Sequence, residues 1–132
     1  MTRPFWKPRG LLDSPRKAAR RLRQLRYYPQ EHVVTLYLNV RHREIGCETV
    51  SIGTLTASLI HPREVFSPAL AYRAAGVLVA HNHPSGDPEP SPEDRDVTRR
   101  LRQAGEILGI PLVDHLIIGA RGHYSFRERG LL

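Results

Sequence analysis

Hydrophobic residues recur at two spacings along this chain, and the two spacings separate predicted helices from predicted strands. Apolar positions three and four residues apart predict amphipathic helices over residues 14–27, 61–75 and 91–109. Ser14 and Ser91 each precede a proline, a pairing that is typical of an N-cap followed by the first helical residue. Pro29 and Gly109 are expected to end the first and the last of these helices.

Short runs rich in β-branched and aromatic residues predict strands between the helices. They cover residues 32–40, 45–52, 54–60, 76–80, 111–118 and 123–126. The wholly apolar run 76–80 is typical of a buried central strand, and the proline-rich run 82–92 that follows is typical of a loop. Strands that alternate with helices, with a hairpin at each end, predict a mixed α/β fold, a β-sheet flanked by helices.

Length and composition fit one globular domain. A chain of 132 residues lies in the usual range for a single domain and is long enough to bury a core without disulfides. The single cysteine, Cys47, excludes an intramolecular disulfide and indicates a reducing compartment, which we expect to be the cytoplasm. No apolar run approaches the roughly 18 residues that a membrane span needs, so we expect no membrane partner.

Positive charge is concentrated near the N-terminus. Residues 1–30 contain nine Lys or Arg and one acid, whereas residues 31–132 contain eleven basic and twelve acidic residues. The sequence thus divides into a basic arm with an amphipathic helix (1–30) and a nearly neutral body (31–132). Five basic residues lie mostly opposite the apolar face of this helix and are candidates for binding the phosphates of DNA: Arg16, Lys17, Arg20, Arg21 and Arg23.

Two other interpretations of the basic arm stay open. A solvated helix face without any ligand explains the same charges equally well. A mitochondrial transit peptide is also rich in arginine and poor in acids. We disfavour it because the helix leads straight into the first predicted strand.

Two histidines stand where the predicted buried strand runs into the loop. Residues two apart on an extended backbone point to the same side, so His81 and His83 can reach one metal ion. Asp94 follows eleven residues later, in the first turn of the next predicted helix. Two histidines and one aspartate leave a fourth tetrahedral position for water, as in catalytic zinc sites. The same donors hold Fe(II) in other folds, so these residues leave the metal open.

A structural interpretation covers part of this pattern. Ser91 and Asp94 also make a good helix start, because the two can cap each other and an acid is favoured at a helix N-terminus. His115 follows Asp114 in a predicted strand, and we interpret it as a hydrogen-bonding residue at the edge of the core, not as a ligand. The other four histidines have no partner at ligand spacing: His32, His42, His61 and His123.

Longer segments around these residues resemble a known family. His81-x-His83, then seven residues, Ser91, two residues and Asp94 match the JAMM motif position for position. The runs HPREVF (61–66), HNHPSG (81–86) and DHLIIG (114–119) resemble RadC-like proteins, and the similarity extends from about residue 31 to the C-terminus. The resemblance implies a JAB/MPN (cytidine-deaminase-like) metalloprotease-type domain.

The resemblance also implies roles for individual residues. His81, His83 and Asp94 match the family's metal ligands, which bind zinc, one ion per chain. Ser91 matches the serine that hydrogen-bonds the tetrahedral intermediate. The family's general base is a glutamate at the start of an early strand, and Glu31 matches that position best.

Two other glutamates compete with Glu31 for the role of base. A helix start explains Glu64 fully, through capping or the helix dipole. Glu48 lies within a predicted strand and is equally well explained as a solvent-facing residue.

The implied activity is hydrolysis of an amide bond in a peptide or isopeptide by metal-activated water. The competing hypothesis is a metal-dependent nuclease or a DNA-associated factor with a role in DNA repair or mobile elements. The basic arm favours that alternative. The helix-hairpin-helix region that many RadC-like proteins carry before the domain is expected to be absent here, which weighs against it. A binding module with a vestigial site is a third possibility, against which the complete ligand set argues.

Overall fold

Helices and strands alternate in the computed structural model, which describes residues 10–53 and 60–132. The helices are α1 (Pro15–Arg21), the 3-10 helix η1 (Arg23–Tyr27), α2 (Pro62–Tyr72) and α3 (Pro92–Leu108). The strands are β1 (His32–Leu38), β2 (Glu44–Ile52), β3 (Gly76–Asn82), β4 (Leu112–Ile118) and β5 (His123–Ser125). Apart from its last residue, the strand predicted over residues 54–60 lies outside the described residues.

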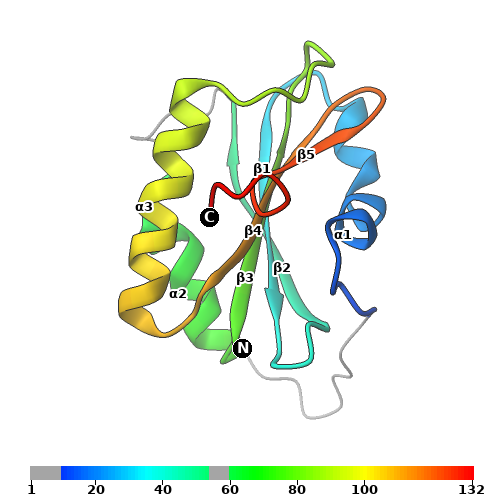
Figure 1. Cartoon of the computed structure of the whole chain (residues 1–132). Coiled ribbons are helices and arrows are strands. Elements are labelled where there is room, and N and C mark those ends of the chain that lie inside the picture. Colours follow the sequence, from blue (N-terminus) through cyan, green and yellow to red (C-terminus); the bar gives the residue numbers. More distant parts are fainter. Residues whose placement is uncertain (1–9, 54–59) are drawn as a thin grey trace.

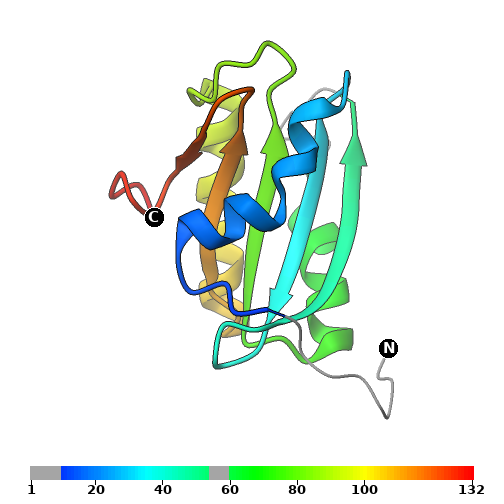
Figure 2. The same ribbon diagram turned by 90° about the vertical axis from the view of Figure 1, so that its right-hand side faces the viewer.

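The five strands form one sheet in the order β2-β1-β3-β4-β5. β3 and β4 run parallel and are connected through α3, whereas β1–β2, β1–β3 and β4–β5 pair antiparallel. α2 and α3 cover one face of the sheet, and α1 with η1 crosses the other face (Figures 1 and 2). The structure therefore confirms the predicted mixed α/β fold, with a hairpin at each edge of the sheet.

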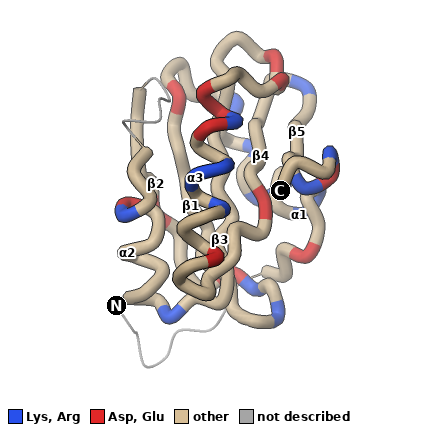
Figure 3. Tube along the Cα trace, turned by 60° about the vertical axis from the view of Figure 1, so that its left-hand side comes forward, with Lys and Arg blue, Asp and Glu red and all other residues tan. Residues whose placement is uncertain are grey.

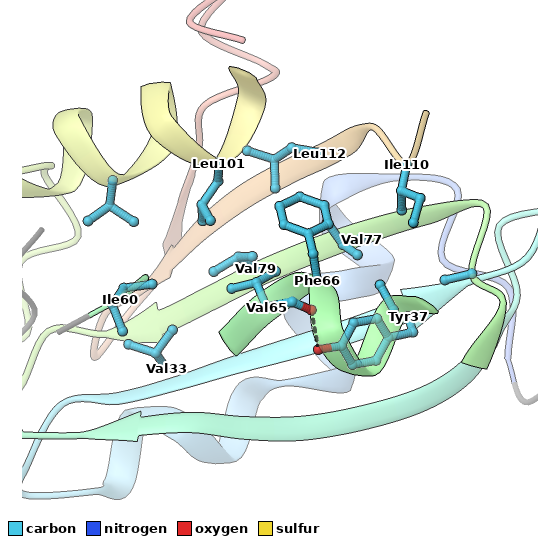
Figure 4. Packing of buried hydrophobic residues seen from close by; sticks show 13 residues of the cluster. Val33, Tyr37, Ile60, Val65, Phe66, Val77, Val79, Leu101, Ile110 and Leu112 are labelled. Atoms are coloured by element: carbon cyan, nitrogen blue, oxygen red, sulfur yellow. Dashed lines mark hydrogen bonds between the residues drawn. The ribbon is translucent and has the colours of Figure 1, made fainter. Parts of the chain in front are cut away.

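The larger hydrophobic cluster lies between the sheet and the pair α2 and α3 (Figure 4). The Tyr37 hydroxyl on β1 donates a 2.7 Å hydrogen bond to the Val65 carbonyl on α2, which satisfies the one polar atom that this ring buries. Gly105 brings α3 close to β4, since a Cβ at this position would lie 2.6 Å from the carbonyl oxygen of Ile110. This close contact sets the position of α3, and therefore of its first turn, relative to the sheet.

A second hydrophobic cluster joins the N-terminal helices to the opposite face of the sheet. It contains apolar residues of β1, β3 and β4. It also contains four apolar residues that precede β1, namely Leu12, Ala18, Leu22 and Leu25. The single helix predicted to reach about residue 27 is interrupted, because α1 ends at Arg21 and η1 continues in 3-10 geometry. Residues three apart in a 3-10 helix are eclipsed, so the tighter winding aligns Leu22 with Leu25 on the buried side.

Some element ends differ from the prediction. β3 extends two residues beyond the expected end, so His81 and Asn82 belong to the strand and not to the loop. α2 continues through Pro68 and ends at Tyr72, three residues before the expected end, and its C-cap residue Arg73 has a left-handed conformation (φ 55°). Among residues 10–53 and 60–132, no helix combines the length and the apolar composition that crossing a bilayer would require.

Candidate metal centre

The fold brings the three predicted metal ligands to one point. His81 is the sixth residue of β3, His83 follows the strand, and Asp94 lies in the first turn of α3. The Nε2 atoms of His81 and His83 are 3.2 Å apart, and each lies 3.0 Å from a different carboxylate oxygen of Asp94. Within the described residues, these three form the one group of His, Cys, Asp or Glu side chains that could hold a metal ion.

A capping box holds the Asp94 carboxylate in place. The Ser91 backbone N–H donates to Asp94 Oδ2 (2.8 Å), and the Asp94 backbone N–H donates to Ser91 Oγ (3.1 Å). The structural role considered for this pair in the sequence is therefore confirmed. Because Ser91 Oγ acts as an acceptor in the box, its own hydroxyl hydrogen stays available for another acceptor, which leaves the predicted contact with a reaction intermediate chemically feasible.

The tautomer of His83 follows from a single contact. Its Nδ1 lies 2.8 Å from the carbonyl oxygen of Asp87, and a carbonyl can only accept. Nδ1 of His83 therefore carries the hydrogen, and Nε2 presents a lone pair toward Asp94 and His81.

The tautomer of His81 follows from a longer relay of buried groups. The Thr98 hydroxyl donates to the carbonyl of Asp94 (2.8 Å), so its oxygen accepts from Nδ1–H of His115. Nε2 of His115 then has a lone pair and accepts from Nδ1–H of His81 at 2.9 Å. With this assignment, Nε2 of His81 also has a free lone pair, and it is directed to the same point as the lone pair on Nε2 of His83. Two imidazole nitrogens and a carboxylate facing one point are a suitable donor set for a divalent cation.

When no cation is bound, a proton on Nε2 of His81 or His83 takes the place of the cation against Asp94, and the pKa shifts describe that form. Burial alone raises the pKa of the Asp94 carboxyl, but hydrogen bonds from His81 and His83 outweigh it and hold the pKa below its usual range. The hydrogen bond to Asp94 raises the pKa of His83 against the opposing effect of burial. Complete burial lowers the pKa of His115 well below its usual value, which keeps that ring neutral as the relay requires.

Replacing Thr98 by valine is expected to weaken zinc binding about tenfold, the lower end of the range for residues that support a ligand. Valine keeps the volume but removes the acceptor for His115, so the tautomer of His81 is no longer fixed. Competition titration of zinc with a chelating dye measures the effect. Thr98→Ser is the matched control and should bind as the wild type does, whereas a valine variant with unchanged zinc affinity would rule out the relay.

Glu31 lies beside the candidate centre. β1 pairs antiparallel with β3 so that Val33 is opposite His81, and the same register continued by two residues places Glu31 opposite His83. The negative charge of Glu31 also contributes to the raised pKa of His83. The glutamate favoured from the resemblance thus lies directly before β1, near enough to His83 to influence its pKa.

Asn82 holds the segment that carries Glu31. Its side chain is fully buried, accepts a hydrogen bond from the His32 backbone N–H (2.7 Å), and donates to the carbonyls of Tyr28 (3.2 Å) and Gln30 (3.0 Å). Asn82 stands between the two candidate histidine ligands, so the short run 81–83 at the end of β3 carries two metal donors and also holds the segment of the candidate base.

The competing glutamates lie elsewhere. Glu48 is exposed in β2 opposite Thr35, in the middle of the β1–β2 pair. Glu64 lies in the first turn of α2, with its side chain 54% exposed beside Arg63. His115 is a buried hydrogen-bonding residue, as interpreted from the sequence, although its contact with His81 was not foreseen.

The five candidate basic residues divide into two sets. Lys17 forms a 2.8 Å ion pair with Asp13, and Arg21 forms two hydrogen bonds of 2.8 and 3.0 Å with the buried Glu44. These two cations already have acidic partners. The other three are exposed on α1 and η1: Arg16, Arg20 and Arg23.

Comparisons with known proteins point to one family. The family model described as RadC-like JAB domain matches residues 12–131, and so begins within the segment treated above as an arm. A UPF0758 protein of Shouchella clausii is 53% identical over 123 residues, which are 92% of this chain and 54% of that protein. A UPF0758 protein of Thermotoga maritima is 51% identical over 121 residues, with the same two shares. One from Symbiobacterium thermophilum is 59% identical over 103 residues, 78% of this chain and 43% of that protein. The chain spans about half the length of these curated relatives.

Proposed function

The chain belongs to the RadC-like JAB domain family, and from this premise we propose that it is a zinc-dependent hydrolase that cleaves an amide bond, as a metallopeptidase or isopeptidase. One observation carries the proposal, the convergence of His81, His83 and Asp94 at the end of β3 with both Nε2 lone pairs directed to one point. The chain spans about half the length of the curated relatives. The activity, substrate and partners of the whole protein are therefore part of this proposal.

Zinc suits this donor set better than the alternatives. Two imidazoles and one carboxylate leave a fourth tetrahedral position, which is the arrangement of catalytic zinc sites. When bound, the ion would supply Lewis-acid activation of water and polarisation of a substrate carbonyl. Fe(II) uses the same donors for oxygen chemistry. The carboxylate of Glu31 and the hydroxyl of Ser91 beside the ligands are groups suited to acyl hydrolysis, and they favour zinc at this site.

The residues beside the ligands fit the two other tasks of the reaction. Glu31 takes the proton from the attacking water and delivers it to the leaving amine nitrogen. The Ser91 hydroxyl donates a hydrogen bond to the developing oxyanion, and one such donor contributes about 3 kcal/mol. Ser91 precedes α3 and is hydrogen-bonded to Asp94, so its hydroxyl stays beside the metal ligands.

The competing hypothesis is a metal-dependent nuclease or a DNA-associated factor. One specific feature favours it, a groove lined with arginines on the face of the sheet that α1 covers. A groove that binds nucleic acid does not by itself imply cleavage of nucleic acid, so we retain amide hydrolysis as the proposed activity.

The test compares substrates on the zinc-loaded protein. Peptides, ubiquitin-like conjugates, and single-stranded and duplex DNA are incubated with the wild type and with Glu31→Gln. We expect zinc-dependent amide cleavage by the wild type alone. DNA cleavage that depends on the same residues, without any amide hydrolysis, would replace this proposal with the nuclease.

A further inference from the structure

A groove of about 280 Å³ lies between the N-terminal helices and the turn that joins β4 to β5. α1 and η1 supply one wall, and residues 118–123 supply the other. Half of the lining residues are arginines and none is acidic. The cationic or titratable side chains in the lining are Arg16, Arg20, Arg23, Arg26, Arg121 and His123.

The winding of the two helices explains why four arginines share this wall. Arg16 and Arg20 are one turn apart in α1, since residues four apart in an α-helix lie on one face. Arg23 and Arg26 are three apart in the 3-10 helix η1, where that spacing is eclipsed. The change in winding that aligns the buried leucines therefore also aligns the arginines along the groove.

These arginines have no acidic partners in the part of the chain that the structure describes. Arg16, Arg20, Arg23 and Arg121 form no ion pair with any acid among residues 10–53 and 60–132. On the side of the molecule formed by α2 and α3, by contrast, basic and acidic positions lie interspersed (Figure 3). Among the described residues, the groove therefore gathers five arginines that form no ion pair, whereas its His123 lies 3.7 Å from Glu128.

Exposed aromatic rings continue the basic row. Tyr27 and Tyr28 directly follow Arg26 and are 70% and 43% exposed. The Arg26 guanidinium lies 4.8 Å from the centre of the Tyr27 ring, and Tyr28 stacks on His32 with ring centres 4.1 Å apart. Large rings held by stacking at the surface are suitable platforms for unpaired nucleobases.

We propose that this groove binds the phosphate backbone of a single-stranded nucleic acid, with bases stacking on Tyr27 and Tyr28. The guanidinium fork matches phosphate oxygens in pairs, and several phosphates in a row match several arginines in a row. An acidic protein surface would satisfy the charges but not the neighbouring rings. A basic groove followed by exposed aromatic side chains is the usual combination in single-strand binding proteins.

The groove adjoins the candidate metal centre. The turn that forms its second wall also contacts the loop of His83, because the His83 N–H donates to the Ile118 carbonyl and the Ala120 N–H donates to the Gly86 carbonyl, both at 3.1 Å. A nucleic-acid strand bound in the groove would lie on the opposite face of the sheet from the metal ligands. Only the turn between β4 and β5 would separate it from the loop of His83. Binding in the groove does not require the metal, so it can be tested separately from the proposed hydrolysis.

The test is fluorescence anisotropy of a short labelled oligothymidine with the intact protein over a range of salt. Four neutralised phosphates would give a slope of log affinity against log salt of about −3, at roughly −0.7 for each phosphate of a single strand. The triple variant Arg20→Gln/Arg23→Gln/Arg121→Gln should lose more than tenfold in affinity and reduce the slope by about 2. Tyr27→Ala should cost about tenfold and Tyr27→Phe little.

The matched control removes the same charge elsewhere, from exposed arginines outside the groove: Arg41→Gln/Arg63→Gln/Arg99→Gln. It should bind the strand as the wild type does, and thermal unfolding should show that both triple variants stay folded. Equal losses in the two triple variants would overturn the proposal, and so would no binding at low salt. Tighter binding of the duplex than of the single strand, or competition by polyglutamate as strong as by unlabelled oligothymidine, would overturn it as well.

Discussion

Replacing Glu31 by glutamine is expected to leave the bound metal in place and to lower amide hydrolysis roughly 10²–10⁴-fold, the usual contribution of a positioned general base. Glutamine keeps the size of the side chain and can still hydrogen-bond water, but it cannot accept a proton. The register of β1 against β3, continued two residues beyond the pair Val33–His81, places residue 31 opposite His83, so we expect the substitution to act beside the ligands without removing one. Zinc content and the hydrolysis rate are measured on the same preparation.

The two other glutamates serve as controls for this substitution. Glu48→Gln changes an exposed residue in the middle of β2, and Glu64→Gln changes a half-exposed residue at the start of α2. Both variants should hydrolyse substrate at the wild-type rate. If Glu48→Gln is inactive and Glu31→Gln is active, the base has been assigned to the wrong strand.

The second large effect is expected at the histidine ligands, and the two should differ. His83→Ala should lose most of the metal and stay folded, because its side chain is 12% exposed in a loop and its hydrogen-bonding partners are Asp87, Asp94 and His81. His81→Ala should lose the metal and also stability, about 1–3 kcal/mol, because it leaves the fully buried His115 without its hydrogen-bond donor. Metal titration and urea unfolding of the metal-free proteins separate these effects.

Equal stability of the two metal-free variants would show that the contact between His81 and His115 contributes little to the fold. A His83→Ala protein that keeps its zinc affinity would be the more serious result, since it would remove one of the three proposed ligands. The wild type stripped of metal is the reference for both comparisons.

The parts of the candidate centre that the sequence predicts are those that depend on short spacings. Residues two apart on a strand point to one side, so His81 and His83 do. The pattern Ser91-x-x-Asp94 specifies a capping box from local sequence alone. The match to a known motif added Glu31. Each of these features is visible within a few consecutive residues.

The supporting residues could not be read from the sequence, because they come together only in the tertiary structure. His115 meets His81 across the parallel pair β3–β4, and Thr98 meets His115 because α3 packs over that pair. Asn82 lies between the two histidines in the sequence, but its partners are residues 28–32, about fifty positions away. The sequence did contain a signal for Asn82, which is a polar residue directly after the apolar run 76–80 and between two histidines.

In the N-terminal segment, too, the sequence did not predict contacts that form only in the tertiary structure. Composition identified a basic stretch, but charge alone could not tell paired cations from unpaired ones. The partner of Arg21 is Glu44, in β2, and the groove beside Arg20 is completed by Arg121, 101 residues away in the sequence. The helix was expected to continue to about residue 27, and its change to 3-10 geometry depends on packing against the sheet, which a helical periodicity does not reveal.

The most direct test of the central claim is the zinc content of the purified protein, measured by elemental analysis beside that of the double variant His81→Ala/His83→Ala. Both proteins are exposed to equal zinc and then dialysed against a weak chelator. The proposed centre predicts one zinc ion per chain in the wild type and close to none in the double variant. Stoichiometric zinc in the double variant, or no zinc in the wild type, would contradict it.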